Sequence, residues 1–243
     1  MSYIREEHGV KYFGYDIDEY PFVDLVSKAF KVDNLQNLHD LLSDTEQDRI
    51  NKRLVPNEKD AHSDLHQIFY EKLNQGWPEL IDTYESFIEG IIAPIFKTEN
   101  IIFQSKPTFR IQFPNNIAVG GNAGDKKGQY GWHRDTDPGY DHPNNEKNFI
   151  IPLTRARDTA SVFIESAPRS DKFYPATMNV GEVFNFSGGE CVHGNKPNGT
   201  GKCRVSFDFR VVLPEDYNEA YGKSSALSTK KFTVGSYYKQ LKK

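Results

Sequence analysis

GECVHGNKPNGTGKCRVSFDFR, residues 189–210, holds a histidine, a turn rich in glycine and a strand of strict alternation. Because successive side chains of a strand point to opposite faces, its polar residues share one face: Arg204, Ser206, Asp208 and Arg210. Val205, Phe207 and Phe209 form the other face, which we expect to pack against hydrophobic material. The polar face then points into a barrel or toward solvent, and an exposed edge strand with an ion-pair ladder is the alternative.

Two arginines inside a barrel would need anions to pair with. A guanidinium binds a carboxylate through two parallel hydrogen bonds. We therefore expect Arg204, helped by the Ser206 hydroxyl, to hold a carboxylate of a ligand inside the barrel. For Arg210 two interpretations stay open: it is neutralised by Asp208, or it reaches a carboxylate of the substrate.

A second motif, His133-Arg134-Asp135, lies where a strand runs into a loop. Residues i and i+2 of a strand share a face, so His133 and Asp135 can converge on one point, with His193 as the third ligand. Two imidazoles and one carboxylate form the facial triad of non-haem iron(II), which leaves open positions for co-substrate and dioxygen. A lone H-x-D motif arises often by chance, and His142 is an alternative ligand.

Around these motifs the chain changes character near residue 100. Apolar residues at helical spacing predict helices at 33–54, 62–73 and 77–96. Beyond them, turn-punctuated runs predict strands at 108–113, 131–135, 148–153, 161–165, 182–186, 190–193 and 202–213. We expect a mainly β single domain over residues 1–243: a helical support layer at 1–100, a β-core at 101–213 and a C-terminal tail at 214–243.

Composition narrows the function classes. The net charge of −4 provides no global attraction for nucleic acid or for anionic lipid. Two cysteines fit a reducing compartment, and neither a signal peptide nor an apolar run of membrane-spanning length is evident. The expected protein is cytoplasmic, with a small-molecule substrate and neither nucleic acid nor membrane as partner.

Five segments, PTFRIQFPN, GWHRD, NFIIPLT, GEVFNFSGG and HGNKPNGTGKCRVSFDFR, together resemble the double-stranded β-helix superfamily of iron(II)/2-oxoglutarate oxygenases. They look closest to the StrG-type group of streptomycin biosynthesis. The resemblance implies a jelly-roll-like barrel buttressed by helices, with His133, Asp135 and His193 on iron and with Arg204 and Ser206 on 2-oxoglutarate. It also implies dioxygen as oxidant, succinate as co-product and a hydroxylase.

The substrate pocket is expected to be polar. Asn148 is a candidate for binding the co-substrate, and the candidates for binding the substrate are Arg110, Gln112, Asn195 and Arg210. They favour a small polar metabolite, either amino-acid-like or an antibiotic precursor. Alternatives that stay open are halogenation, desaturation or epimerisation by the same iron centre, a nucleic-acid demethylase, and a non-catalytic metal-binding barrel. Because halogenases of this superfamily lack the carboxylate ligand, Asp135 favours hydroxylation.

Overall fold

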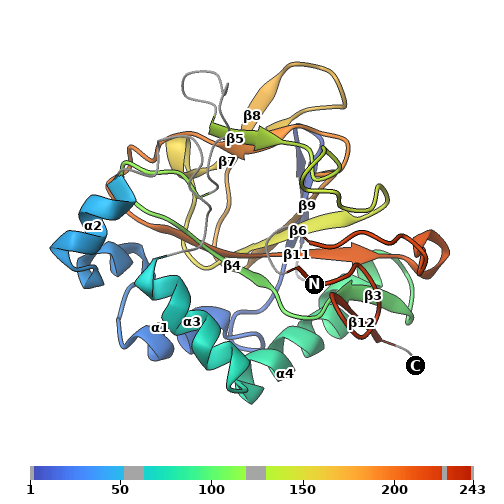
Figure 1. Ribbon diagram of the computed structural model, residues 1–243, viewed down its shortest axis with the longest axis horizontal. Helices are drawn as coiled ribbons and strands as arrows, with labels where there is room; N and C mark the ends of the chain where they lie inside the picture. Colours follow the sequence, from blue (N-terminus) through green and yellow to red (C-terminus); the bar gives the residue numbers. More distant parts are fainter. Residues whose placement is uncertain (1–2, 52–62, 119–129, 226–228, 242–243) are drawn as a thin grey trace.

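The centre of the molecule is a pair of antiparallel sheets (Figure 1). The computed structural model describes residues 3–51, 63–118, 130–225 and 229–241. Eight of its strands lie between residues 108 and 212: β4 (Thr108–Gln112), β5 (Tyr130–His133), β6 (Lys147–Pro152), β7 (Val162–Glu165), β8 (Phe173–Ala176), β9 (Glu182–Phe186), β10 (His193–Asn195) and β11 (Arg204–Val212). The larger sheet contains β4, β11, β6 and β9 as neighbours, and the smaller contains β5, β10, β7 and β8. The chain thus winds between the sheets, so the predicted double-stranded β-helix is confirmed.

Four further strands widen the larger sheet. β1 (Ile4–Glu7) and β2 (Val10–Gly14) extend it beyond β9, while β3 (Ile101–Gln104) and β12 (Tyr238–Leu241) extend it beyond β11. The sequence pattern did not predict these strands. The first hundred residues are therefore not all helical, and part of the expected C-terminal tail is a strand, β12, paired with β3.

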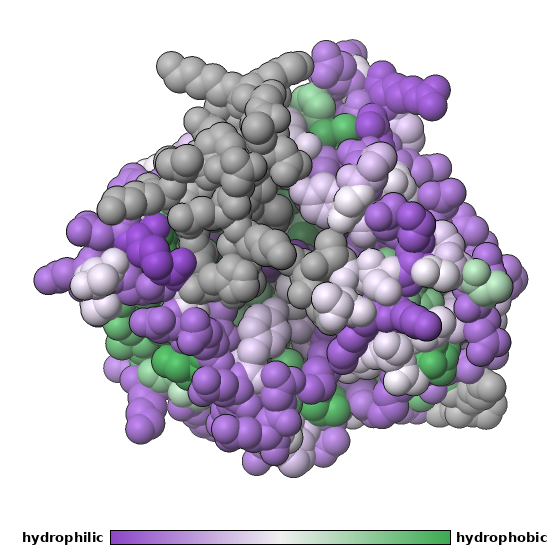
Figure 2. Space-filling model, in the orientation of Figure 1, coloured by the Kyte–Doolittle hydropathy of each residue, from purple (hydrophilic) through white to green (hydrophobic). Residues whose placement is uncertain are grey.

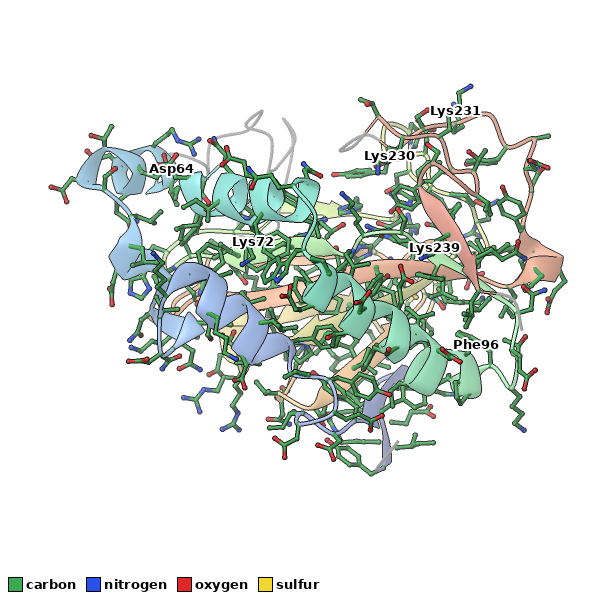
Figure 3. All side chains as sticks on the ribbon, turned by 90° about the horizontal axis from the view of Figure 1, so that it is seen from below. Asp64, Lys72, Phe96, Lys230, Lys231 and Lys239 are labelled. Atoms are coloured by element: carbon green, nitrogen blue, oxygen red, sulfur yellow. The ribbon has the colours of Figure 1, made fainter. Side chains whose placement is uncertain are left out.

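Helices cover the face of the larger sheet that points away from the smaller one (Figures 1 and 3). The main ones are α1 (Phe22–Phe30), α3 (Asp64–Asn74) and α4 (Pro78–Phe87), and a 3-10 helix η1 (Leu35–Leu41) leads to α2 (Asp44–Asn51). Ser63 caps α3, because its hydroxyl accepts from the His66 amide. After α4 the chain continues as a π-turn η3 (Ile88–Ile92) and α5 (Ala93–Ile95), where Pro94 lacks the amide hydrogen of a regular helix.

The core explains why β11 alternates. Val205, Phe207 and Phe209 are 0% exposed and face the helices. The ring of Phe207 lies 5.9 Å from that of Phe22 on α1, and the ring of Phe209 lies 5.4 Å from that of Tyr84 on α4. Each buried phenylalanine contributes about 1.5–3 kcal/mol from the area it removes from water. The apolar face of β11 therefore attaches the helical layer, which leaves its polar face for the space between the sheets.

The face seen in Figure 2 is mostly polar where its residues are described: hydrophilic side chains predominate there, with hydrophobic ones in small groups. Among the helices of the described residues, none combines the length and apolar character needed to cross a bilayer.

Candidate metal centre

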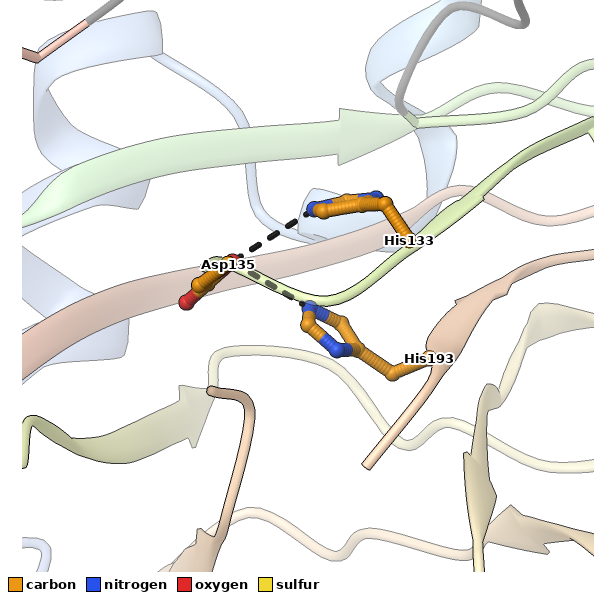
Figure 4. A group of neighbouring side chains, drawn as sticks. All are labelled: His133, Asp135 and His193. Atoms are coloured by element: carbon orange, nitrogen blue, oxygen red, sulfur yellow. Dashed lines mark ion pairs between the residues drawn. The ribbon is translucent and has the colours of Figure 1, made fainter. Parts of the chain in front are cut away.

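Three ligand-type side chains meet at one mouth of the β-helix (Figure 4). His133 ends β5 and His193 begins β10, and the two are direct cross-strand partners in the smaller sheet. Asp135 follows β5 by two residues. Its Oδ1 lies 3.4 Å from His133 Nε2 and 3.5 Å from His193 Nε2, and the ligand atoms all lie within 4.8 Å of one another. The predicted convergence of these three residues is thus found.

Both imidazoles are oriented by backbone carbonyls. His133 Nδ1 lies 2.6 Å from the Gly131 carbonyl oxygen, and His193 Nδ1 lies 3.2 Å from that of Cys191. Since a carbonyl can only accept, each Nδ1 carries a hydrogen, so Nε2 is the ring atom that each histidine can offer to a metal. Burial lowers the pKa of His133 and outweighs the raising effect of Asp135, which favours the neutral ligand form.

The carboxylate of Asp135 has its other oxygen fixed. Asn148 Nδ2 donates to Oδ2 at 2.5 Å, and Arg210 donates to the same atom from Nη2 at 3.1 Å and from Nε at 3.3 Å. Asn148 and Arg210 are cross-strand partners on β6 and β11, so sheet register delivers both groups to one atom. Burial would raise the pKa of Asp135, but Arg210 and the imidazoles hold it well below its usual range. The carboxylate is therefore charged, with Oδ1 directed to the imidazoles.

Gly188 makes this arrangement possible. Its amide donates to Asn148 Oδ1 at 3.2 Å, and its carbonyl accepts from the Asp135 amide at 2.9 Å. A Cβ at position 188 would lie 2.6 Å from the Asn148 side-chain amide, closer than real Cβ contacts come. Glycine is thus required where the turn after β9 touches both partners.

The donor set suits a divalent transition metal. Two atoms that each bind one ion at about 2.1 Å are about 3.0–3.4 Å apart, close to the distances from Asp135 Oδ1 to the two Nε2 atoms. Two imidazoles and one carboxylate, on one side of a pocket, match the facial triad of non-haem iron(II). His142, the alternative ligand, lies elsewhere: its Nδ1 is 2.7 Å from Glu146 Oε2, and its ring packs on Phe232.

A pocket of about 540 Å³, part of it open solvent, joins this centre to the predicted anchor. Both triad histidines line it, as do Arg204 and Ser206. Arg204 is 2% exposed, and it donates from Nη1 to Ser206 Oγ at 3.1 Å and from Nε to Gln112 Oε1 at 3.2 Å. The guanidinium and the two triad histidines therefore face the same space, as a chelating co-substrate requires.

The remaining predicted residues have varied places. Asn148 and Arg210 line the pocket, but their polar groups donate to Asp135. Arg210 also forms an ion pair with Asp208, with Nη1 lying 3.6 Å from Oδ2. Gln112 is 0% exposed and outside the residues that line the pocket; its amide donates to the Asn116 and Lys196 carbonyls, and its oxygen supports Arg204. Gln112 therefore helps to position Arg204, and a substrate contact for it stays a prediction.

Arg110 and Asn195 do line the pocket as expected. Arg110 Nε donates to Asp208 Oδ2 at 3.2 Å. The backbone carbonyl of Asn195 accepts from Trp132 Nε1 at 2.8 Å. Sequence reasoning considered Asp208 only as an ion-pair partner of Arg210 and assigned no role to Gly188, although the alternation of β11 had already placed Asp208 on the polar face.

Comparison with known proteins gives one strong sequence match. No protein-family model matches the chain. The streptomycin biosynthesis protein StrG of Streptomyces griseus is 30% identical over 224 residues, which cover 92% of this chain and 94% of that protein.

Solved structures show weaker likeness. AviO1 from Streptomyces viridochromogenes is 15% identical with a TM-score of 0.39, covering 85% of this chain and 90% of that one. A Pseudomonas putida prolyl-4-hydroxylase is 13% identical with a TM-score of 0.36, covering 84% and 92%. The winding of the sheets and the triad agree with the resemblance of the motifs to iron(II)/2-oxoglutarate oxygenases, and the sequence match shows the family: the chain belongs to the StrG family.

Proposed function

We propose that the protein is an iron(II)- and 2-oxoglutarate-dependent dioxygenase that hydroxylates a C–H bond of a small polar metabolite. The observation that carries the proposal is one pocket lined by both the two triad histidines and a buried guanidinium, that of Arg204. A triad alone would suit many metal proteins. The added cation supplies the binding site for the far carboxylate of 2-oxoglutarate.

His133, Asp135 and His193 would hold the metal. Bound iron(II) supplies the redox chemistry that couples the oxidation of 2-oxoglutarate by dioxygen, to succinate and carbon dioxide, with hydroxylation of the substrate. Because Asn148 and Arg210 occupy Asp135 Oδ2, only Oδ1 faces the imidazoles, so Asp135 contributes a single ligand atom. A metal held by three protein atoms would stay open to the co-substrate and to dioxygen.

Arg204 and Ser206 orient the co-substrate. Arg204 Nε donates to Gln112 Oε1, so the orientation of the guanidinium plane is fixed before the co-substrate binds. Apolar residues complete the walls and limit the entry of water: Ala118, Phe149, Ile150, Val162 and Phe186. A carboxylate placed here would exchange hydration for a fixed, charge-assisted contact.

The test is spectroscopic first and catalytic second. Anaerobic protein with iron(II) and 2-oxoglutarate should give the weak visible charge-transfer band of the chelate; dioxygen and a metabolite mixture should then release succinate above the background without metabolites. His133→Ala and Asp135→Ala should abolish both signals. His8→Ala and Asp18→Ala, at exposed positions, serve as matched controls. A wild-type protein without the band, or alanine variants that keep it, would refute the proposal.

A further inference from the structure

Two buried polar atoms that belong to pocket-lining residues have no hydrogen-bond partner in the part of the chain that the structure describes. They are the amide nitrogen Nδ2 of Asn195 and the carboxylate oxygen Oδ1 of Asp208. Asn195 as a whole is 3% exposed, and the side chain of Asp208 is 16% exposed. An unsatisfied buried polar atom is unfavourable and uncommon in native proteins. Two of them on one pocket point to a ligand that supplies both partners.

The two residues stand on opposite walls. Asp208 lies on β11 in the larger sheet, between Ser206 of the anchor and Arg210 of the metal centre. Asn195 ends β10 in the smaller sheet, two residues after the triad ligand His193. A molecule that reaches both therefore lies between the sheets, beside the metal centre.

Asp208 is fixed rather than free to rotate. Its Oδ2 accepts from Arg110 Nε at 3.2 Å and lies 3.6 Å from Arg210 Nη1. Burial would raise the pKa of Asp208, but these two arginines lower it, so the group is an anion that can only accept. With Oδ2 engaged, the remaining oxygen needs a donor.

Neither cofactor provides that donor. The ionised 2-oxoglutarate carries two carboxylates and a ketone, all of them acceptors. The oxygens of Asp208 are also outside the group of ligand atoms that could share an ion with the triad. Among the organic ligands of the proposed reaction, only the substrate can supply this donor.

We propose that Asp208 and Asn195 select the substrate, Asp208 by accepting from a hydroxyl or ammonium group and Asn195 by donating to a substrate oxygen. The substrate class is then an amino alcohol or polyol, and a molecule that carries only carboxylates is rejected. Calling this ligand the substrate rests on the proposed function; the two contacts rest on the pocket alone.

The experiment uses 2-amino-1,3-propanediol as a probe, because this small molecule carries one ammonium group and two hydroxyls. Anaerobic protein saturated with iron(II) and 2-oxoglutarate is titrated with it in a calorimeter, and malonate, which offers only acceptors, is titrated in parallel. We expect the amino diol to bind and malonate not to bind. Asp208→Asn should weaken the amino diol at least about tenfold, the usual size of a lost charge-assisted hydrogen bond.

Further variants keep the result interpretable. Asn195→Ser removes the orphaned donor without touching an ion pair, and it carries the test if Asp208→Asn folds poorly. Glu79→Gln, exposed at the start of α4, is the control and should bind as the wild type does. Wild-type protein that ignores the amino diol, or binds malonate equally well, overturns the proposal. So do equal affinities in wild type and in all folded pocket variants, which would mean that water satisfies both atoms.

Failure of this inference is distinguishable from failure of the proposed function. The charge-transfer band reports iron and 2-oxoglutarate, and calorimetry reports the donor-bearing ligand. A normal band without amino diol binding rejects only the inference. Binding that depends on Asp208 in protein without the band rejects the oxygenase and keeps the two contacts.

Discussion

Arg210→Met should destabilise the metal-free protein by about 3–5 kcal/mol. Methionine keeps most of the length of the side chain but removes the only cation within hydrogen-bond distance of Asp135 among the described residues. Asp208 loses a neighbour at 3.6 Å through the same change. All three side chains are at most 16% exposed, so solvent screens the lost charge poorly. Removing one partner of a buried pair typically has this cost.

The assay is thermal and urea unfolding with a chelator present. For a domain of this size the expected loss lowers the melting temperature by about 6–20 °C. Lys239→Met is the matched control. The side chains of Lys239 and Glu85 are 51% and 32% exposed, so their ion pair should contribute only about 0–1 kcal/mol to stability. Saturating cobalt(II) should recover part of the loss in the Arg210 variant, since a bound cation neutralises Asp135. A loss no larger than that of the control would show that the guanidinium is dispensable and would refute the electrostatic account of the centre.

Three more predictions concern other parts of the site and the core. Arg204→Met should raise the 2-oxoglutarate concentration needed for half-maximal band intensity at least about tenfold, because a charge-assisted contact is lost; an unchanged titration would place the anchor elsewhere. Gly188→Ala should weaken cobalt(II) binding, measured by calorimetry, because the new Cβ displaces Asn148. Gly201→Ala is the control: its φ is positive, but a Cβ there meets open space, so the affinity for cobalt(II) should not change. Equal cobalt(II) affinities in the two variants would contradict the packing argument. Burial raises the pKa of Cys191 to about 11 and that of Cys203 to about 12, so at pH 8 very little of either thiol is the reactive thiolate. Iodoacetamide should therefore modify neither cysteine before the protein unfolds. Rapid labelling of native protein, seen by mass spectrometry, would contradict this.

Acid should destabilise the fold through Asp208. Folding lowers the pKa of this group, so its stabilisation is complete above the ordinary value of about 3.9 and is lost as the pH falls through the lower folded value. Asp208→Asn should therefore be less stable than wild type at pH 7, with a smaller difference at pH 3. Urea midpoints at the two pH values measure this, and a difference that does not shrink would contradict it.

The sequence predicted strands that alternate or lie between clear turns, and it missed others, among them β3 and β8. β9 was predicted with its observed bounds, and β11 to within two residues at its start, because each alternates or lies between clear turns. β3 is a four-residue run with every residue buried, so it has no period to detect. β8 contains Pro175, which argues against a strand in general but is tolerated here because β8 is at the edge of the smaller sheet.

The site divides in a similar way. The i, i+2 spacing predicted that His133 and Asp135 converge, and the chemistry of the set pointed to His193. The two residues do converge, but Asp135 lies in the turn after β5 and not on the strand. The roles of Asn148 and Arg210 could not be read in this manner. Their meeting at Asp135 depends on the register between β6 and β11, which the whole sheet determines, and on the turn at Gly188. Local patterns do not encode a contact between strands sixty residues apart.

The two faces of β11 have a consequence for divergence among homologues. Its aromatic face packs against the helices. Its polar face carries, in order along the strand, the proposed co-substrate site at Arg204 and Ser206, the proposed substrate contact at Asp208, and Arg210, which binds Asp135. The two sets of side chains therefore touch different neighbours. Mutations on one set need not disturb the other. A lineage could thus exchange the residue at position 208 and acquire new chemistry on new compounds while inheriting the same scaffold, and paralogues should differ there before they differ at Phe207 or Phe209.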